Sequence, residues 1–180
     1  MRPTRLDRSL PRVVHAEDLA GYTAVQLMDV MRTFMAILAL PQSAAEHVDA
    51  LVIPIGQGEE WRLTHAIRRW ETNPEIVEAL GITSLALTVS PYHLPRVYLT
   101  VLKALSRSGI RVPLIPDPVP VSPDTAAPET QATAYDLLPG EAERILRYMN
   151  KGWVATFEEL QRYLQWLWSD HKALLTKTRA

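Results

Sequence analysis

The sequence predicts an α/β fold, in which a small, mainly parallel sheet of about three strands is flanked by helices and followed by a C-terminal helical pair. Two observations lead to this fold class. Strand-like and helix-like apolar patterns alternate along the first part of the chain, which is typical of parallel strands joined by right-handed crossovers. A proline-rich stretch then separates these segments from two amphipathic helices.

The predicted strands are short apolar runs, at 50–55, 84–89 and 111–115. The first run is apolar without alternation, which is typical of a strand buried on both faces of a parallel sheet. Pro113 weakens the third run, so we expect that strand at an edge of the sheet.

The predicted helices have apolar residues at helical spacing. A first helix at 16–39 carries one apolar stripe, which comprises Leu27, Met28, Met31, Phe34, Met35 and Leu38. Methionine-rich stripes can bind partners, but this spacing favours a face that packs in the core. Further helices are expected at 59–70, at 74–80 and from about Leu94 to Arg107.

The C-terminal part is predicted to be helical. Six prolines fall between 113 and 128, a density that excludes a helix there. One helix is expected from about Pro139 to Asn150, and a second from the capping box that begins at Thr156. The expected parts are a basic N-terminal arm at 1–12, a Rossmann-like α/β domain at 13–115, a Pro-rich linker at 116–135 and a helical extension packed on the same domain at 136–180.

Composition excludes several classes of protein. The chain of 180 residues has no cysteine, which excludes disulfide scaffolds, thiolate metal sites and cysteine nucleophiles. Its longest apolar run, Phe34 to Leu40, is far shorter than the roughly 20 residues of a bilayer-spanning helix. The formal net charge of −1 argues against a dedicated nucleic-acid binder, although the arginines of 1–12 could contact phosphates or be solvated. We therefore expect a cytoplasmic protein with no membrane partner.

Two loops follow predicted strands, where open α/β sheets bind ligands. The first contains Gly56, Gln57, Gly58 and Arg62. Its glycines allow close approach of the backbone, and the N–H groups of the following helix can hold an anion. It lacks the third glycine of a dinucleotide-binding loop and the Gly-Lys-Ser/Thr of a Walker A loop. An ordinary strand–helix turn is the alternative.

The second loop places several polar side chains directly after the second strand. Pro95 indicates that the next helix begins near Leu94, so Ser90, Tyr92 and His93 lie in an exposed loop and Arg96 in the first helical turn. A hydroxyl, a phenol, an imidazole and a guanidinium can together bind an anionic or ribose-like group and move a proton. The alternative is that the two ring side chains pack and cap locally. No histidine has a second ligand at metal spacing, so no metal site is predicted.

This second loop resembles the YdcF/SanA/ElyC-type domain of bacteria, a family of poorly defined biochemistry. The family's motif reads like V-T-S-x-Y-H-x-x-R-A, and it is matched here by Thr88, Ser90, Tyr92, His93 and Arg96. The resemblance implies a Rossmann-like fold with a ligand pocket over the strand ends. It also makes S-adenosylmethionine a ligand to test, because some members are reported to bind it.

The chain differs from that family in length. Only residues 70–83 separate the first helix of the resemblance from the second strand, so the chain is similar to a shortened variant that lacks a middle segment. The segment 143–156 also looks like the C-terminal helical extension of some members.

Two main functions follow. In the first, the chain binds a nucleotide-like or phosphorylated ligand and is either a binding protein or an enzyme: Gly56, Gln57, Gly58, Arg62 and Arg96 hold the ligand, and the catalytic residues are His93, Ser90 and Tyr92. In the second, the chain is a degenerate, non-catalytic member that acts as a homo-oligomeric interaction module, for example a homodimer. Nucleic-acid binding through the N-terminal arm is a third reading.

Overall fold

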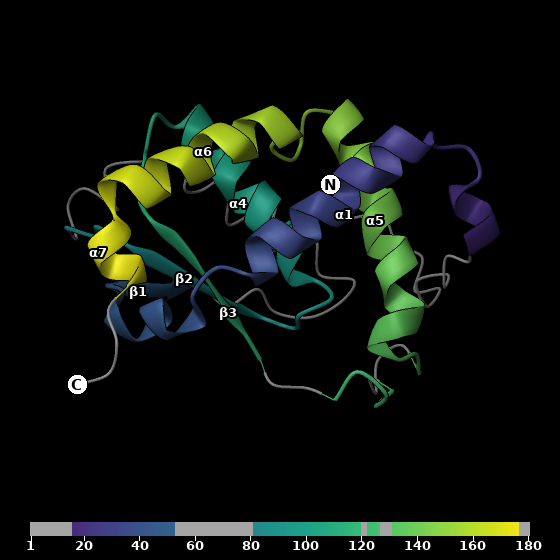
Figure 1. Cartoon of the computed structure of the whole chain (residues 1–180), viewed down its shortest axis with the longest axis horizontal. Coiled ribbons are helices and arrows are strands. Elements are labelled where there is room, and N and C mark those ends of the chain that lie inside the picture. The colour runs from purple at the N-terminus through teal and green to yellow at the C-terminus, as the bar shows by residue number, and fades with distance from the viewer. Residues whose placement is uncertain (1–15, 53–80, 120–121, 127–130, 177–180) are drawn as a thin grey trace, which may run out of the picture.

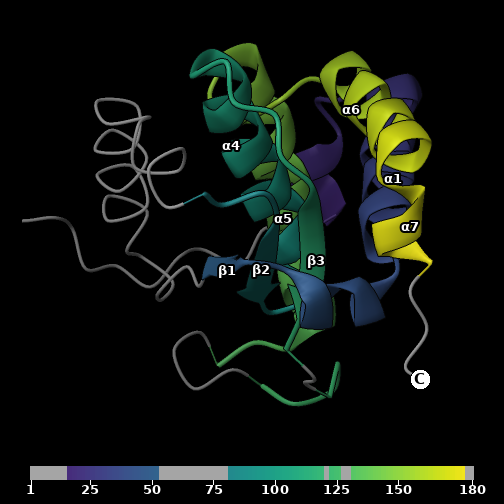
Figure 2. The same cartoon turned by 90° about the vertical axis from the view of Figure 1, so that its left-hand side faces the viewer.

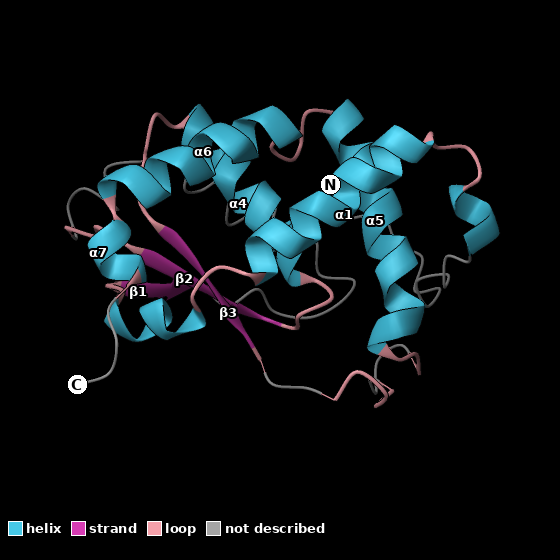
Figure 3. Cartoon of the chain, in the orientation of Figure 1, coloured by secondary structure: helices cyan, strands magenta, loops and turns pink. Residues whose placement is uncertain are grey.

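The computed structural model describes residues 16–52, 81–119, 122–126 and 131–176 (Figure 1). In the described residues three short strands lie on one side of the molecule, and the longer helices lie above and to the right of them in Figure 3. In chain order the elements are η1 (Ala16–Leu19), α1 (Ala24–Leu38), η2 (Gln42–His47), β1 (Ala50–Val52), β2 (Leu85–Val89), α4 (Leu94–Arg107), β3 (Leu114–Pro118), α5 (Ala134–Asn150), α6 (Phe157–Asp170) and α7 (Lys172–Leu175).

The sheet confirms the predicted fold class. It has three parallel strands in the order β1-β2-β3, with Leu85 beside Ala50 on one side and beside Leu114 on the other. Helix α4 connects β2 to β3, and Figure 2 shows α4 on one side of β3 and α6 with α7 on the other. The result is an α/β layered fold with additional C-terminal helices.

The two outer strands differ in how well the sequence predicted them. The third strand lies at an edge, as expected, but it spans Leu114–Pro118 rather than 111–115, so its last three residues fall in the predicted linker. The prediction that 50–55 is buried on both faces is wrong for its described part, 50–52. Here β1 is an edge strand, and Leu51 is 58% exposed. In this small sheet, a continuous apolar run therefore does not identify a central strand.

Helix α1 also differs from its prediction. Residues 16–39 form two helices, because η1 ends at Leu19 and a capping box at Thr23 begins α1. The core face consists of Val30, Phe34 and Ile37, together with Thr33. The three methionines expected in the core stripe are instead exposed, at 54% for Met28, 59% for Met31 and 66% for Met35.

Helix α5 begins earlier than predicted. Its start is set by Thr133, whose hydroxyl accepts a hydrogen bond from the Asp136 backbone N–H while the Asp136 carboxylate accepts from the Thr133 N–H. Pro139 therefore lies inside the helix rather than at its first residue. This capping box replaces the start signal that Pro139 indicated.

The C-terminal helices pack against the sheet domain through specific bonds. The Tyr163 hydroxyl of α6 accepts from the Leu114 N–H at 2.6 Å and donates to the Val112 carbonyl at 2.8 Å. The Lys103 ammonium of α4 donates to Glu159 at 2.6 Å. Helices α5 and α6 both contribute to one hydrophobic core, in which Ile145 of α5 and Leu167 of α6 are fully buried. Among the described residues, no helix is long and apolar enough to cross a membrane.

Candidate functional site

The loop after β2 is positioned by the start of α4. The Ser90 carbonyl accepts hydrogen bonds from the N–H groups of His93 and Leu94, both at 3.0 Å. Helix α4 then begins at Leu94 with Pro95 in its first turn, as predicted. Because β2 is the central strand and its carboxyl end leads into this loop, Ser90, Tyr92 and His93 lie at the carboxyl edge of the sheet.

A buried carboxylate meets this loop from a different part of the chain. Glu141 of α5 is 2% exposed, and its Oε2 atom lies 2.6 Å from the Arg96 Nε and 3.2 Å from the His93 Nδ1. Its other oxygen, Oε1, accepts from the Arg144 Nη1 at 2.8 Å. We call these four residues the Glu141 cluster: His93, Arg96, Glu141 and Arg144.

The two ring nitrogens of His93 differ in their contacts. Nδ1 lies 3.2 Å from the Glu141 Oε2 and 3.0 Å from the Arg96 Nη2. Nε2 lies 3.3 Å from the same Arg96 Nη2 atom. The contact at Nε2 is long for a hydrogen bond. Nε2 is therefore the ring atom whose present partner is most easily replaced.

The electrostatics of the cluster keep Glu141 ionised. Burial alone would raise the pKa of the Glu141 carboxyl, but the hydrogen bond from His93 and the charge and hydrogen bond of Arg96 outweigh it and lower the pKa to about 2. Glu141 is therefore charged throughout the neutral range. The two guanidiniums and the one carboxylate of the cluster together carry a net charge of about +1.

The two arginines of the cluster differ in exposure. The Arg96 side chain is 6% exposed, lies in contact with both Glu141 and His93, and has the Tyr148 ring 5.8 Å from its guanidinium carbon. The Arg144 side chain is 18% exposed. Arg96, which we expect to bind the ligand, is thus almost fully buried, whereas the Arg144 side chain is partly exposed.

Other polar side chains of the same edge surround the cluster. The Tyr92 ring is tilted against the His93 ring, with the centroids 6.3 Å apart, and both Ser90 and Tyr92 are half-buried. At the ends of β2 and β3, the Thr88 hydroxyl donates to the Asp117 carboxylate at 2.5 Å. Thr88 and Asp117 are register partners, so these two side chains share one face of the sheet.

Part of the predicted site cannot be placed. The first loop, with Gly56, Gln57, Gly58 and Arg62, lies outside the described residues. The structure therefore brings together His93 and Arg96 and places Ser90 and Tyr92 beside them, and it does not address the first loop.

Sequence reasoning missed Glu141 and Arg144. Their helix had been predicted, but nothing in its pattern separates a buried glutamate from a solvated one. The only available signal is the position of Glu141 in α5. Glu141 lies one helical turn after Leu137 and one turn before Ile145. The side chains of Leu137 and Ile145 are both buried. A charged residue between two core residues on one face needs a partner of opposite charge.

Searches for similar proteins do not identify the site. The chain matches no protein-family model, no curated protein and no solved structure. Within the described ranges there is also no group of three or more His, Asp or Glu side chains that could hold a metal ion. The function must therefore be argued from the geometry of the carboxyl edge.

Proposed function

We propose that this chain binds a small anionic ligand, nucleotide-like or phosphorylated, at the carboxyl edge of its sheet beside His93. The observation that carries the proposal is the Glu141 cluster, in which one buried carboxylate is bonded by two arginines and a histidine. The net charge of about +1 from Arg96, Arg144 and Glu141 lies next to His93 Nε2, whose contact with the Arg96 Nη2 is long, at 3.3 Å.

The residues of the cluster have different tasks in this proposal. Arg96 and Glu141 are positioning residues, because both are almost fully buried and fix the ring of His93. Arg144 and His93 are the residues that meet the ligand, because their side chains are 18% and 15% exposed. Charge-assisted hydrogen bonds from a guanidinium are well suited to a phosphate or carboxylate.

A nucleotide-like ligand also fits the neighbouring strand ends. The Asp117 carboxylate already accepts a hydrogen bond from the Thr88 hydroxyl, and a ribose offers further hydroxyl donors. S-adenosylmethionine, the ligand that the family resemblance suggests, carries both a ribose and a carboxylate. In the catalytic form of the proposal, His93 exchanges a proton with the ligand, and Ser90 and Tyr92 stand beside it. The chain is then a shortened YdcF/SanA/ElyC-like protein, with the loop Gly56–Arg62 as a second contact.

The proposal is tested by calorimetric titration with inorganic phosphate, AMP and S-adenosylmethionine. We expect at least one of the three to bind, and Arg144→Gln to weaken that binding by about tenfold or more. Arg147→Gln is the matched control, because Arg147 lies on the same helix, is 48% exposed and pairs only loosely with Glu143, at 3.6 Å. Absence of binding by all three probes to the folded protein refutes the proposal, and so does equal binding by both variants.

A second function, a homo-oligomeric interaction module, is supported by the exposed face of α1. Val25, Met28, Met31 and Met35 are between 54% and 69% exposed, and methionine side chains adapt to apolar partner surfaces. Light scattering at several concentrations tests it. A dimer mass that Met31→Glu abolishes and Arg32→Gln keeps supports the module, and a monomer at every concentration refutes it.

A further inference from the structure

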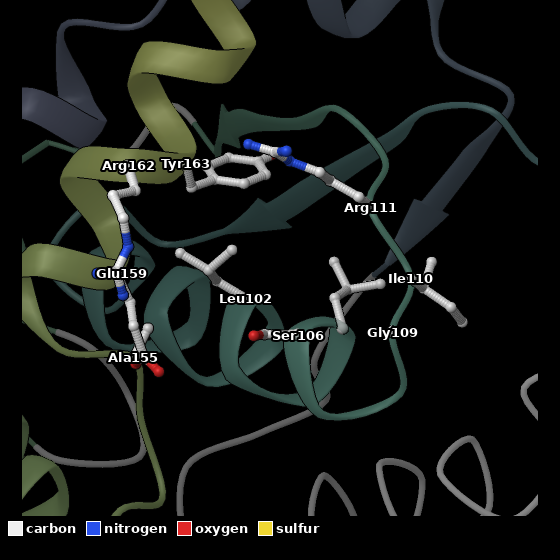
Figure 4. A pocket seen from close by; sticks show the side chains of 10 residues that line it. Leu102, Ser106, Gly109, Ile110, Arg111, Ala155, Glu159, Arg162 and Tyr163 are labelled. Atoms are coloured by element: carbon white, nitrogen blue, oxygen red, sulfur yellow. The ribbon is translucent and has the colours of Figure 1, made fainter.

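A pocket lies at the opposite end of α4 from His93. It has a volume of about 310 Å³ and is formed by the last turns of α4, the turn at 109–111 and the first half of α6 (Figure 4). Helix α4 begins at the carboxyl edge of the sheet and ends at the amino edge. Its 14 residues correspond to a length of about 20 Å. The two sites are therefore separate.

The floor of this pocket is apolar. Leu102 and Leu105 of α4 are 5% and 1% exposed, and Tyr163 of α6 is 6% exposed. In Figure 4 the Leu102 side chain points into the space between α4 and α6, toward the Tyr163 ring. The Tyr163 hydroxyl is occupied by the backbone at Val112 and Leu114, so this residue presents the face of its ring rather than a polar group.

The rim of the pocket is polar and positively charged. Ser106, Arg111 and Arg162 are exposed. In Figure 4 Arg162 comes from α6, Arg111 comes from the turn after α4 and reaches toward the Tyr163 ring, and the Ser106 oxygen lies on the α4 side. The pocket contains one carboxylate, Glu159, which is bonded by Lys103 at 2.6 Å. Within the part of the chain that the structure describes, Arg111 forms no ion pair or hydrogen bond, whereas the charge of Arg162 helps to lower the pKa of the Glu158 and Glu159 carboxyls.

One of these arginines is held in place without using its donors. The Arg111 guanidinium carbon lies 4.4 Å from the centroid of the Trp166 ring, and the Trp166 and Tyr163 rings are 5.4 Å apart. Stacking orients a guanidinium but leaves the N–H groups at its edge available. Arg111 is therefore a preorganised donor above an apolar floor, which lowers the entropic cost of binding an anion.

We propose that this pocket binds a small monocarboxylate with an apolar or aromatic body. The carboxylate bonds to Arg111 and Arg162 at the rim, and the apolar body packs on Leu102, Leu105 and the Tyr163 ring. A volume of about 310 Å³ is at the lower end of small-molecule pockets, which favours a ligand of about the size of an aromatic acid. Arg111, Arg162, Lys103 and Glu159 together carry a net charge of about +2.

The probe for the experiment is phenylacetate, with phenylacetamide as its neutral counterpart of similar shape. Binding is followed by chemical-shift changes of the full-length protein during titration. We expect phenylacetate to shift signals of α4 and α6 and to bind about tenfold more tightly than the amide. Arg111→Gln is expected to weaken phenylacetate binding by about tenfold, while Arg32→Gln, which removes an exposed arginine outside this pocket, leaves it unchanged.

Two further results keep the test decisive. Ser106→Trp places a large ring at the exposed rim and is expected to abolish binding without changing the fold, which the remaining signals report. The proposal is overturned by absence of binding to the folded protein, by equal affinity for acid and amide, or by shifts that centre on His93. His93→Asn is expected to leave phenylacetate affinity unchanged, so that this pocket and the proposed carboxyl-edge site succeed or fail separately.

Discussion

Replacing Glu141 is expected to destabilise the protein strongly. Glu141→Gln keeps the shape of the side chain but removes the charge that compensates Arg96, which is 5% exposed. Breaking a buried ion pair by neutralising one partner typically costs about 3–5 kcal/mol. The lowered pKa of Glu141 agrees in direction with this cost. The difference between the usual value of 4.5 and about 2 corresponds to roughly 3 kcal/mol at 1.36 kcal/mol per pH unit.

The measurement is urea unfolding at pH 7, with Glu143→Gln as the matched control. Glu143 lies two residues away on the same helix, is 19% exposed and is 3.6 Å from Arg147, so its replacement is expected to cost less than about 1 kcal/mol. We expect Glu141→Gln to lower the free energy of unfolding by about 3 kcal/mol at pH 7.

The pH dependence of this effect has a definite sign. The folded pKa of Glu141 lies below its unfolded value, so its contribution is complete above about pH 4.5 and is lost as the pH falls toward about 2. The stability gap between the wild type and Glu141→Gln is therefore expected to narrow to about half of its pH 7 value near pH 3. A gap below 1 kcal/mol at pH 7, or a gap that stays constant down to pH 3, would refute this account of the cluster.

Three other substitutions test the packing that supports the two sites. Tyr163→Phe leaves the Leu114 N–H and the Val112 carbonyl without their hydroxyl partner, and urea unfolding is expected to show a loss of about 3 kcal/mol. Thr156→Ala removes the cap of α6 and is expected to cost about 1 kcal/mol, whereas Thr176→Ala, at an exposed hydrogen bond near the C-terminus, is expected to cost less than half as much. Gly152→Ala places a Cβ at a φ of 69° and is expected to cost about 1 kcal/mol, measured as a lowered Tm.

The fold class was predictable because it depends on local patterns. Apolar runs separated by a crossover helix allow few arrangements, and the start of α4 at Leu94 followed from the position of Pro95. The exposure of Leu51 and of the α1 methionines was not predictable from such local patterns. Their exposure depends on which neighbouring element covers them, and a helical stripe does not carry that information.

The candidate site was half predictable for a similar reason. His93 and Arg96 lie three residues apart and come together through helix geometry alone. Glu141 lies 45 residues after Arg96, and its contact with Arg96 depends on how α5 packs against α4. Local spacing therefore identified the histidine and the arginine, while the carboxylate that fixes both required the tertiary structure.

The hydroxyl of Tyr163 also has a consequence for assembly. The Pro113 carbonyl accepts from the Leu85 N–H of β2, so the polar groups of Val112 and Leu114 face away from the sheet. Tyr163 occupies two of these groups, and the Tyr98 hydroxyl donates to a third, the Leu114 carbonyl, at 2.9 Å. The hydroxyls of Tyr98 and Tyr163 thus occupy the outward-facing backbone groups at the start of β3. A strand from another chain cannot pair with this edge without displacing them. A chain shortened before α6 would open this edge and become prone to intermolecular β-pairing and aggregation.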